Sequence, residues 1–189
     1  MLLSPFSFAL VGWSVLFLVW FIGFFGNKRT VKIEHWVEQS VVSGLFLVGF
    51  FLLGFPNAFG WLGLVIVPAG ALNWIGALLV FGSVGFAIWA RMTLGKNWSG
   101  AVITLKEDHE LVTDGPYALV RHPIYTGFLG AAIGTAFSVG TVSGFLGTAA
   151  ILAGFLIRIR REEELMTAQF PNEYPAYKQR TKALVPFVI

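Results

Sequence analysis

Long apolar segments recur along this chain of 189 residues and limit the folds open to it. They run from Phe6 to Gly26, from Trp36 to Phe55 and from Leu72 to Ala90. An α-helix rises 1.5 Å per residue, so about 20 apolar residues cross the hydrocarbon core of a bilayer. Charged residues make up only 12% of the chain, about half the share in a soluble domain. These features predict an integral membrane protein with at least three helical spans.

A fourth apolar segment, Pro123 to Ile157, contains no charged residue and is too long for a single span. Small and hydroxyl-bearing residues gather near its middle, at 138–144, which indicates a turn between two helices. In lipid, small residues favour close helix contact, because packing rather than the exclusion of water drives association there. Such residues recur along the first arm of the segment, at Gly127, Gly130, Ala131 and Gly134. We therefore predict an all-α integral membrane protein with five transmembrane helices, of which the last two form a hairpin.

The basic residues lie on one side of this arrangement. With five spans, the segments 27–35, 91–122 and 158–189 share a side, and they hold three, four and six of the 13 Lys and Arg residues. The positive-inside rule places that side in the cytoplasm, which is where we expect the C-terminus, with the N-terminus outside. In a prokaryote the membrane would be the inner membrane. The first apolar segment precedes its basic residues, the reverse of the order in a cleaved signal peptide.

We expect residues 1–189 to form a single membrane domain with two parts. Residues 1–90 contain spans one to three, and residues 91–189 contain most of the polar groups. Any chemistry is therefore assigned to the second part. The chain has no cysteine, which excludes disulfides, thiolate metal sites and a cysteine nucleophile, and no metal site is predicted.

Two polar stretches in this second part could carry chemistry. In the first, a turn at 114–116 precedes Tyr117, which would share a helical face with Arg121 four residues later. Pro123 suits the first turn of span four, with His122 as its N-cap. The free N–H groups at a helix start favour an anion such as a cofactor carboxylate. The alternative is that this Arg-His-Pro sequence is only an interfacial anchor and a helix start.

The second stretch is the charged run 158–164 at the end of span five. Arg158 and Glu162 lie four residues apart and so face the same way on a helix. An arginine at the lipid boundary could clamp a carboxylate or phosphate, while the glutamate binds a cation or a hydroxyl. The pattern alone, however, favours a solvated helix extension. Further on, aromatic residues at helical spacing are interpreted as packing of the tail: Phe170, Tyr174 and Tyr177.

Several motifs occur in a fixed order from Lys96 to the C-terminus, over about half of the chain. They are Asn97-Trp98-Ser99, His109-x-Leu111-Val112, Gly115-x-Tyr117, Arg121-His122-Pro123-x-Tyr125-x-Gly127, and Glu162-Glu163 followed by Phe170, Glu173-Tyr174 and Tyr177. The ordered set resembles the isoprenylcysteine carboxyl methyltransferase family and its bacterial and archaeal relatives.

The resemblance implies a membrane-embedded methyltransferase that uses S-adenosyl-L-methionine. The cofactor would bind in a cytosolic pocket built from the loop before span four and the C-terminal tail. A lipophilic small-molecule or lipid-linked acceptor would enter from the bilayer and be held by Arg158 and Glu162. The resemblance also implies which residues would line the cofactor site. They are His109, Glu110, Leu111, Val112, Tyr117, Val120, Arg121, His122, Pro123, Tyr125 and Glu163.

Two positions depart from the family pattern. Pro171 follows the phenylalanine where a glycine is usual. The segment from Lys182 to Pro186 lacks the arginine often found upstream of the final proline. Lys182 could replace the charge of that arginine but not its two parallel hydrogen bonds to a carboxylate. The acceptor is therefore the least defined part of the expected function.

Three other functions stay open. Phospholipid N-methyltransferases share a similar Arg-His-Pro and Glu-Glu arrangement. Nicotinamide-dependent sterol or enone reductases also carry an Arg-His-Pro, although the sequence shows no further basic cluster for a dinucleotide phosphate. A non-enzymatic membrane scaffold is least favoured, because it would leave the polar segment before span four without a purpose. Apart from the acceptor and membrane lipid, no partner is predicted, neither nucleic acid nor protein.

Overall fold

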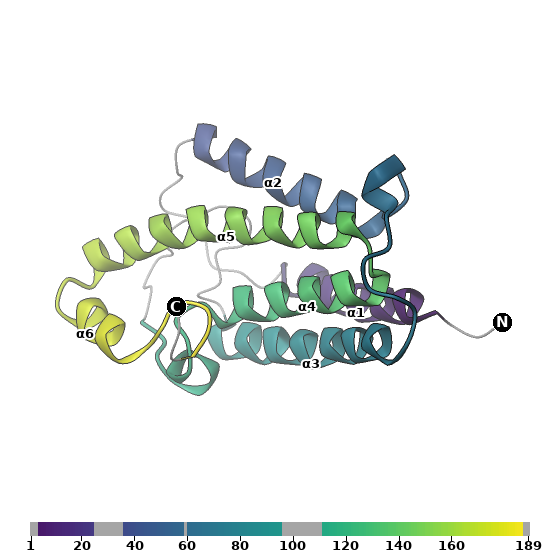
Figure 1. The fold of residues 1–189 in the computed structure, drawn as a ribbon. Helices are drawn as coiled ribbons and strands as arrows, with labels where there is room; N and C mark the ends of the chain where they lie inside the picture. Colours follow the sequence, from purple (N-terminus) through teal and green to yellow (C-terminus); the bar gives the residue numbers. More distant parts are fainter. Residues whose placement is uncertain (1–3, 25–35, 59, 96–110, 187–189) are drawn as a thin grey trace.

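Six α-helices account for most of the residues that the computed structural model describes, which are 4–24, 36–58, 60–95 and 111–186 (Figure 1). Within those ranges, β-pairing is limited to two isolated bridges, so the predicted all-α class is confirmed. In chain order the helices are α1 (Pro5–Phe24), α2 (Trp36–Gly54), α3 (Ala71–Leu94), α4 (Pro123–Val139), α5 (Val142–Gln169) and α6 (Glu173–Arg180), with short 3₁₀ helices η1 (Gly60–Gly63) and η3 (Gly115–Ala118) in the connections.

Three helices are long and apolar enough to cross a membrane: α1, α3 and α5. The apolar parts of α2 and α4, Glu38–Gly54 and Pro123–Val139, are shorter. At 1.5 Å per residue, the 17 residues of α4 reach about 25 Å, which is less than the roughly 30 Å of a hydrocarbon core. The five expected apolar helices therefore form, and the crossing of the membrane by all five stays a prediction.

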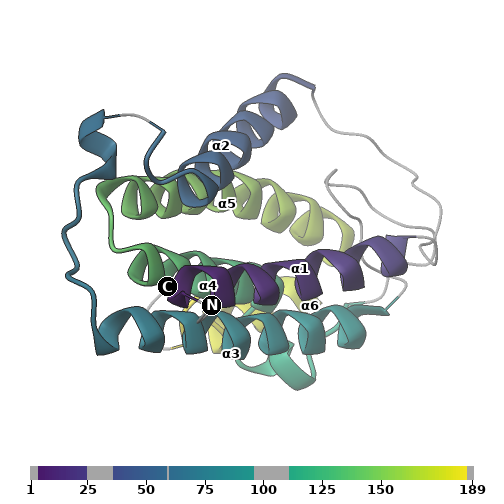
Figure 2. The same cartoon turned by 90° about the vertical axis from the view of Figure 1, so that its right-hand side faces the viewer.

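Contacts near helix ends indicate the relative directions of α1, α2, α3 and α5. Arg91, near the end of α3, donates a hydrogen bond to the carbonyl of Gly23, near the end of α1. Glu38, at the start of α2, pairs with Arg161, near the end of α5. One end of the bundle thus holds the ends of α1, α3 and α5 and the start of α2. Figure 2 shows α1 alongside α3, with α2 crossing over α5.

The interface between α3 and α4 depends on glycine. A Cβ placed on Gly76 would lie 2.5 Å from the carbonyl oxygen of Gly134 and 2.7 Å from the Cβ of Phe137. A Cβ placed on Gly127 would lie 2.7 Å from the carbonyl oxygen of Ser83. The two backbones are therefore in contact, as the recurring small residues of α4 predicted.

Glycine serves two purposes around α5. Gly140 ends α4 with a φ of 73°, a left-handed conformation that favours glycine, and α5 begins two residues later. Gly147 faces Gly49 of α2, since a Cβ on Gly147 would lie 2.6 Å from the Gly49 carbonyl oxygen. The first glycine makes the predicted hairpin possible, and the second lets α2 pack closely on α5.

The centre of the bundle is apolar and includes a buried hydrogen bond between helices. Leu16, Val80 and Ile151, from α1, α3 and α5, have no exposed surface. Among them, the indole Nε1 of Trp13 donates to the hydroxyl of Thr135 over 2.8 Å, which joins α1 to α4. A tryptophan N–H buried in such surroundings needs this partner.

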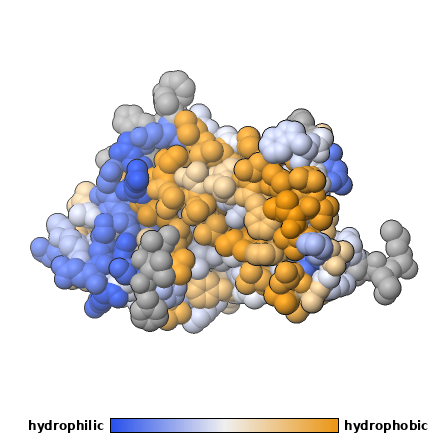
Figure 3. Space-filling model, viewed as in Figure 1, coloured by the Kyte–Doolittle hydropathy of each residue, from blue (hydrophilic) through white to orange (hydrophobic). Residues whose placement is uncertain are grey.

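Helix α5 continues to Gln169, well beyond Ile157, where span five was predicted to end. The added residues are mostly Arg, Glu and Met, which are good helix formers. Figure 3 shows that hydrophilic residues gather over this end of α5 and over α6, whereas hydrophobic residues cover most of the remaining face. The extension therefore carries charged residues past the apolar bundle and toward α6.

Candidate active site

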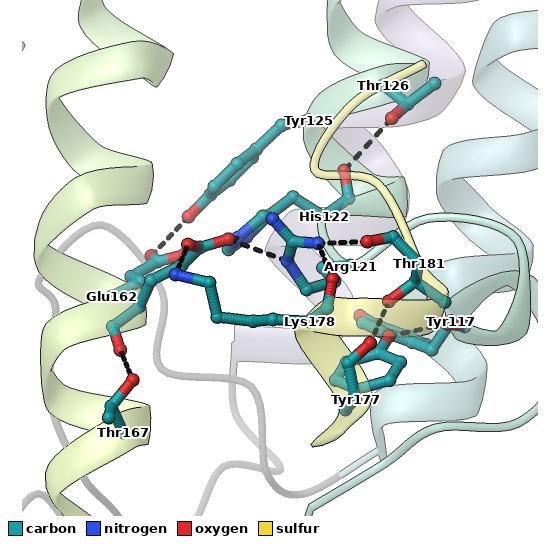
Figure 4. Close-up of polar contacts among 11 residues, drawn as sticks. Tyr117, Arg121, His122, Tyr125, Thr126, Glu162, Thr167, Tyr177, Lys178 and Thr181 are labelled. Atoms are coloured by element: carbon teal, nitrogen blue, oxygen red, sulfur yellow. Dashed lines mark hydrogen bonds and ion pairs between the residues drawn. The ribbon is translucent and has the colours of Figure 1, made fainter. Parts of the chain in front are cut away.

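The start of α4, the end of α5, and α6 with the tail after it meet at the hydrophilic end of the bundle (Figure 4). Charged and aromatic side chains from these elements contact one another there. We call this set the polar cluster, and its members are Arg121, His122, Tyr125, Arg158, Glu162, Glu163 and Lys178.

His122 lies at the centre of the polar cluster. It is the N-cap of α4 and Pro123 occupies the first turn, as predicted. The Nδ1 atom of His122 lies 3.4 Å from Oε2 of Glu162, and its Nε2 atom lies 3.4 Å from Oε1 of Glu163. Its ring is parallel to that of Tyr125, with 2° between the planes. The side chain is only 9% exposed, so the imidazole is enclosed between two carboxylates and an aromatic ring.

Arg158, Tyr125 and Glu162 form one half of the polar cluster. The Nε atom of Arg158 donates to the Tyr125 hydroxyl over 2.6 Å and to Oε1 of Glu162 over 2.9 Å. Tyr125 donates its own hydrogen to the same carboxylate. The Arg158 side chain is 6% exposed, so the solvated helix extension favoured by the pattern is wrong at this residue. Arg158 and Glu162 share a face, as predicted, and that face is turned toward α4.

Glu163 organises the other half of the polar cluster. Its Oε1 atom accepts from Nε of Arg121 over 2.8 Å, and its Oε2 atom pairs with Nζ of Lys178 over 2.6 Å. Arg121 also donates to the backbone carbonyl of Thr181. The loop before α4, the end of α5 and α6 are thereby joined through one carboxylate.

The tail after α6 pairs with the segment that precedes α4. The backbone N–H of Arg121 donates to the carbonyl of Lys182 over 2.8 Å, and that of His122 donates to Ala183 over 3.0 Å. One turn into α4, the hydroxyl of Thr126 donates to the carbonyl of Leu184, which is fully buried. Lys182 is exposed and joins the site through its backbone carbonyl, and its part as a point charge stays a prediction.

Tyr117 lies in the loop before α4 and is held there by α6. It belongs to the 3₁₀ helix η3, which ends at Ala118, so the predicted α-helical face shared with Arg121 is wrong. The hydroxyl of Tyr177 donates to the carbonyl of Tyr117 over 2.5 Å. Burial raises the pKa of Tyr177 to about 12 and also raises the pKa of Tyr117. Both hydroxyls therefore stay protonated at neutral pH.

The remaining residues predicted for the cofactor site are placed differently. His109 and Glu110 lie outside the described residues, as does the Asn97-Trp98-Ser99 motif. Leu111 and Val112 are partly buried, and Val112 packs against the apolar cluster of Ala90, Tyr117 and Ile124. Val120 and Pro123 have almost no exposed surface. Val120 and Pro123 flank Arg121 and His122 in the chain. Contact with the cofactor stays a prediction for all the residues assigned to the cofactor site.

Two groups of the site were not among the predicted residues. Lys178 looks like an ordinary basic residue in the last turn of α6, and its side chain is 41% exposed. The carbonyl of Thr181 accepts a hydrogen bond from Arg121, and a backbone acceptor has no signature in the sequence. Lys178 lies one helical turn after Tyr174, and this spacing is a sequence signal that could have pointed to it.

The charges of the polar cluster do not balance. Three cations, on Arg121, Arg158 and Lys178, face the two carboxylates of Glu162 and Glu163. Burial lowers the pKa of His122, but hydrogen bonds and charges from both glutamates outweigh it and raise this pKa above its ordinary value. The described cluster therefore carries at least one excess positive charge, which suits an anionic ligand.

Fold and site together define a helical membrane protein with a buried, ionised cluster at one end of its bundle. A family model described as "Isoprenylcysteine carboxyl methyltransferase (ICMT) family" matches residues 74–168, about half of the chain. The chain therefore belongs to the isoprenylcysteine carboxyl methyltransferase family. The matched region contains α4 and nearly all of α3 and α5, and it includes every member of the polar cluster except Lys178.

Similar individual proteins include a methyltransferase and a protein named for metal resistance. Protein-S-isoprenylcysteine O-methyltransferase of Schizosaccharomyces pombe is 32% identical over 130 residues, which are 64% of this chain and 55% of that protein. The nickel-cobalt-cadmium resistance protein NccN of Alcaligenes xylosoxydans xylosoxydans is 35% identical over 120 residues, which are 60% of this chain and 53% of that protein. This chain thus spans about half the length of the curated relatives it matches.

A solved structure shares the fold. It is that of the eukaryotic intramembrane Ras methyltransferase ICMT, with a TM-score of 0.53 and 25% sequence identity. The match covers 82% of this chain and 55% of that chain. The likeness therefore includes elements outside the region that the family model matches.

Proposed function

We propose that this protein transfers a methyl group from S-adenosyl-L-methionine to a carboxylate on a lipophilic acceptor, an isoprenylcysteine-like molecule or another small membrane-soluble nucleophile. The observation that carries the proposal is the buried Arg158, which is held by Tyr125 and Glu162 where α5 leaves the apolar bundle. Family membership supports the same reaction. The reaction would take place at the membrane face that carries the polar cluster, which we expect to be cytoplasmic.

The donor set of the polar cluster fits S-adenosyl-L-methionine. This cofactor presents an ammonium group, a carboxylate and a sulfonium cation, and the cluster offers both carboxylates and cations within one site. When bound, the cofactor supplies an electrophilic methyl group. Arg121 and Lys178 would hold its carboxylate, because both are cations beside the tail, and Glu163 would attract its positive charge. The tail segment from Thr181 to Leu184 would limit the access of water.

A carboxylate acceptor suits the other half of the polar cluster. A carboxylate is already a nucleophile, so its methylation needs no general base. The guanidinium of Arg158 would bind it, and the Tyr125 hydroxyl and Glu162 would fix the guanidinium in place. Positioning and the exclusion of water would then supply the acceleration. An amine acceptor would need a base, whereas both carboxylates of the cluster are held by cations.

The test is methyl transfer from radiolabelled S-adenosyl-L-methionine by the detergent-purified protein, with matched acceptors. A farnesylated cysteine derivative with a free carboxylate should be methylated, and the methyl ester of the same compound should not. Phosphatidylethanolamine serves as the amine acceptor. Its methylation, without that of the carboxylate, would replace our proposal with phospholipid N-methylation. No transfer to any lipophilic acceptor by the folded protein would contradict methyltransferase activity.

A further inference from the structure

Glu162 and Glu163 are neighbours on α5, yet both reach the same imidazole. Successive residues of an α-helix point about 100° apart and do not normally face one another. Here one carboxylate meets Nδ1 of His122 and the other meets Nε2, each over 3.4 Å. We propose that His122, as an imidazolium, is a positioning residue that holds these two carboxylates in their working orientation. Its consequence for catalysis rests on the proposed function.

The hydrogen-bonding capacity of imidazole supports the charged form. Neutral imidazole carries a single N–H, so one of its nitrogens presents a lone pair. Because both nitrogens of His122 face carboxylate oxygens, a neutral ring would set that lone pair against an acceptor. The ring is 9% exposed, so water has little room to separate the two. Only the doubly protonated ring can donate to both glutamates.

His122 connects the two halves of the polar cluster. On one side, Oε1 of Glu162 accepts from Tyr125 and Arg158, and Oε2 faces the imidazole. On the other side, Glu163 accepts from Arg121 and pairs with Lys178, and its Oε1 atom also faces the imidazole. The side proposed to hold the acceptor is therefore tied to the side proposed to hold the cofactor. Loss of the proton would release one glutamate from this arrangement.

Other charges around His122 act in the opposite direction. Arg121 from the preceding loop, Arg158 from α5 and Lys178 from α6 are all cations, and each is paired with one of the same two glutamates. Tyr125 of α4 stacks on the ring and is uncharged. The two direct contacts to carboxylates outweigh burial, so the pKa of His122 lies above its ordinary value of 6.5.

The raised pKa fixes the direction of the pH dependence. A group whose pKa is higher in the folded chain than in the unfolded chain stabilises the fold fully below the unfolded value. That stabilisation is present below about pH 6.5 and is lost as the pH rises through the folded pKa of His122. The kcat of methyl transfer should fall over the same range, because Glu162 then loses one of its supports.

The experiment is a pH titration of ¹⁵N-histidine-labelled protein in detergent micelles, followed by NMR. The chain has three histidines, and loss of one signal in His122→Gln assigns His122. We expect an imidazolium spectrum at neutral pH and a midpoint above 6.5. A neutral tautomer at pH 7, or a midpoint at or below 6.5, would overturn the proposal.

Two variants should shift the titration midpoint of His122 in opposite directions. Glu163→Gln removes a carboxylate partner and should lower the midpoint of His122 by about one pH unit or more. Lys178→Met removes an exposed competing cation and should raise it. Glu164→Gln is the matched control, because Glu164 is exposed and pairs with Arg161 instead, and it should leave the midpoint in place. Equal shifts in Glu163→Gln and Glu164→Gln would show that His122 senses general charge, and the proposal would fail.

The titration of His122 and the methyl-transfer assay can fail independently of each other. If His122 titrates as expected but no acceptor is methylated, the methyltransferase proposal fails while the bridging role stands. If methyl transfer occurs with a kcat that is independent of pH between 6.5 and 9, His122 is not a positioning residue for the reaction.

Discussion

The α3–α4 interface and the polar cluster hold helices together in opposite ways. Between α3 and α4, Gly76 and Gly134 bring the two backbones into contact. In the polar cluster, long charged side chains such as Arg158 and Arg121 join elements through buried ion pairs. Apolar side chains gain little from leaving lipid, so close backbone packing is what stabilises the first region. A buried charge is stable only when it is paired, so the second region depends on its ion pairs.

The largest effect is expected from Arg158→Gln in the polar cluster. Its removal takes from the partly buried Glu162 its closest cationic partner and leaves only His122 beside it, which should lower the free energy of unfolding by about 1–3 kcal/mol. Methyl transfer should fall by at least about 100-fold, because the acceptor loses its anchor. Thermal unfolding in detergent and the transfer assay measure both. Arg160→Gln is the control, since Arg160 is exposed on the same helix. Equal losses in the two variants would contradict a specific role for Arg158.

Gly76→Ala tests the apolar interface. The added methyl would lie 2.5 Å from the Gly134 carbonyl and 2.9 Å from the Ser138 nitrogen, and neither backbone atom can move aside cheaply. We expect the free energy of unfolding to fall by about 1–3 kcal/mol. Gly82→Ala on the same helix meets nothing within 4 Å and should be neutral or slightly stabilising. If both variants unfold alike, backbone contact does not hold α3 on α4.

Thr135→Val tests the hydrogen bond that crosses the apolar centre. Valine keeps the shape of threonine but leaves the buried indole N–H of Trp13 without its acceptor. We expect destabilisation of about 1 kcal/mol, measured by unfolding in detergent. Ser14→Ala on α1 is the control, because Ser14 is exposed and its hydroxyl donates to the carbonyl of Leu10 in the same helix. A Thr135→Val variant as stable as the parent would mean that the N–H finds another partner.

The smallest effect is expected from Arg161→Gln. Arg161 pairs with Glu38 of α2 and with Glu164, over 2.5 and 2.8 Å, but its side chain is more than a third exposed. Solvent screening should make this pair contribute nothing measurable to stability. Unfolding curves of Arg161→Gln and the parent protein should therefore overlap. A clear loss would show that α2 depends on this ion pair as well as on Gly49.

Much of the fold followed from the sequence, because its strongest signals are local. The apolar runs predicted the five long helices. For α2 and α3 the predicted bounds lie within a few residues of the observed ones. The small residues of α4 indicated its close contact with α3. The end of α5 was predicted too early, since a run of charges ends an apolar segment without ending a helix.

The site was less predictable, because its contacts join distant segments. The i,i+4 spacing of Arg158 and Glu162 was visible, but the burial of Arg158 was not, since it depends on α4 covering that face of α5. The pairing of Thr181 to Leu184 with the start of α4 uses backbone groups, which every residue carries. Only the order of the motifs, through resemblance to a family, pointed to these segments together.

The most direct test of the account is calorimetric titration of the detergent-purified protein with S-adenosylhomocysteine, the product of the proposed cofactor. We expect wild-type protein to bind it, Arg121→Gln to bind at least about tenfold more weakly, and Arg160→Gln to bind as well as wild type. Absence of binding by folded wild-type protein, or equal affinity in Arg121→Gln and Arg160→Gln, would contradict the assignment of the polar cluster to methyl transfer.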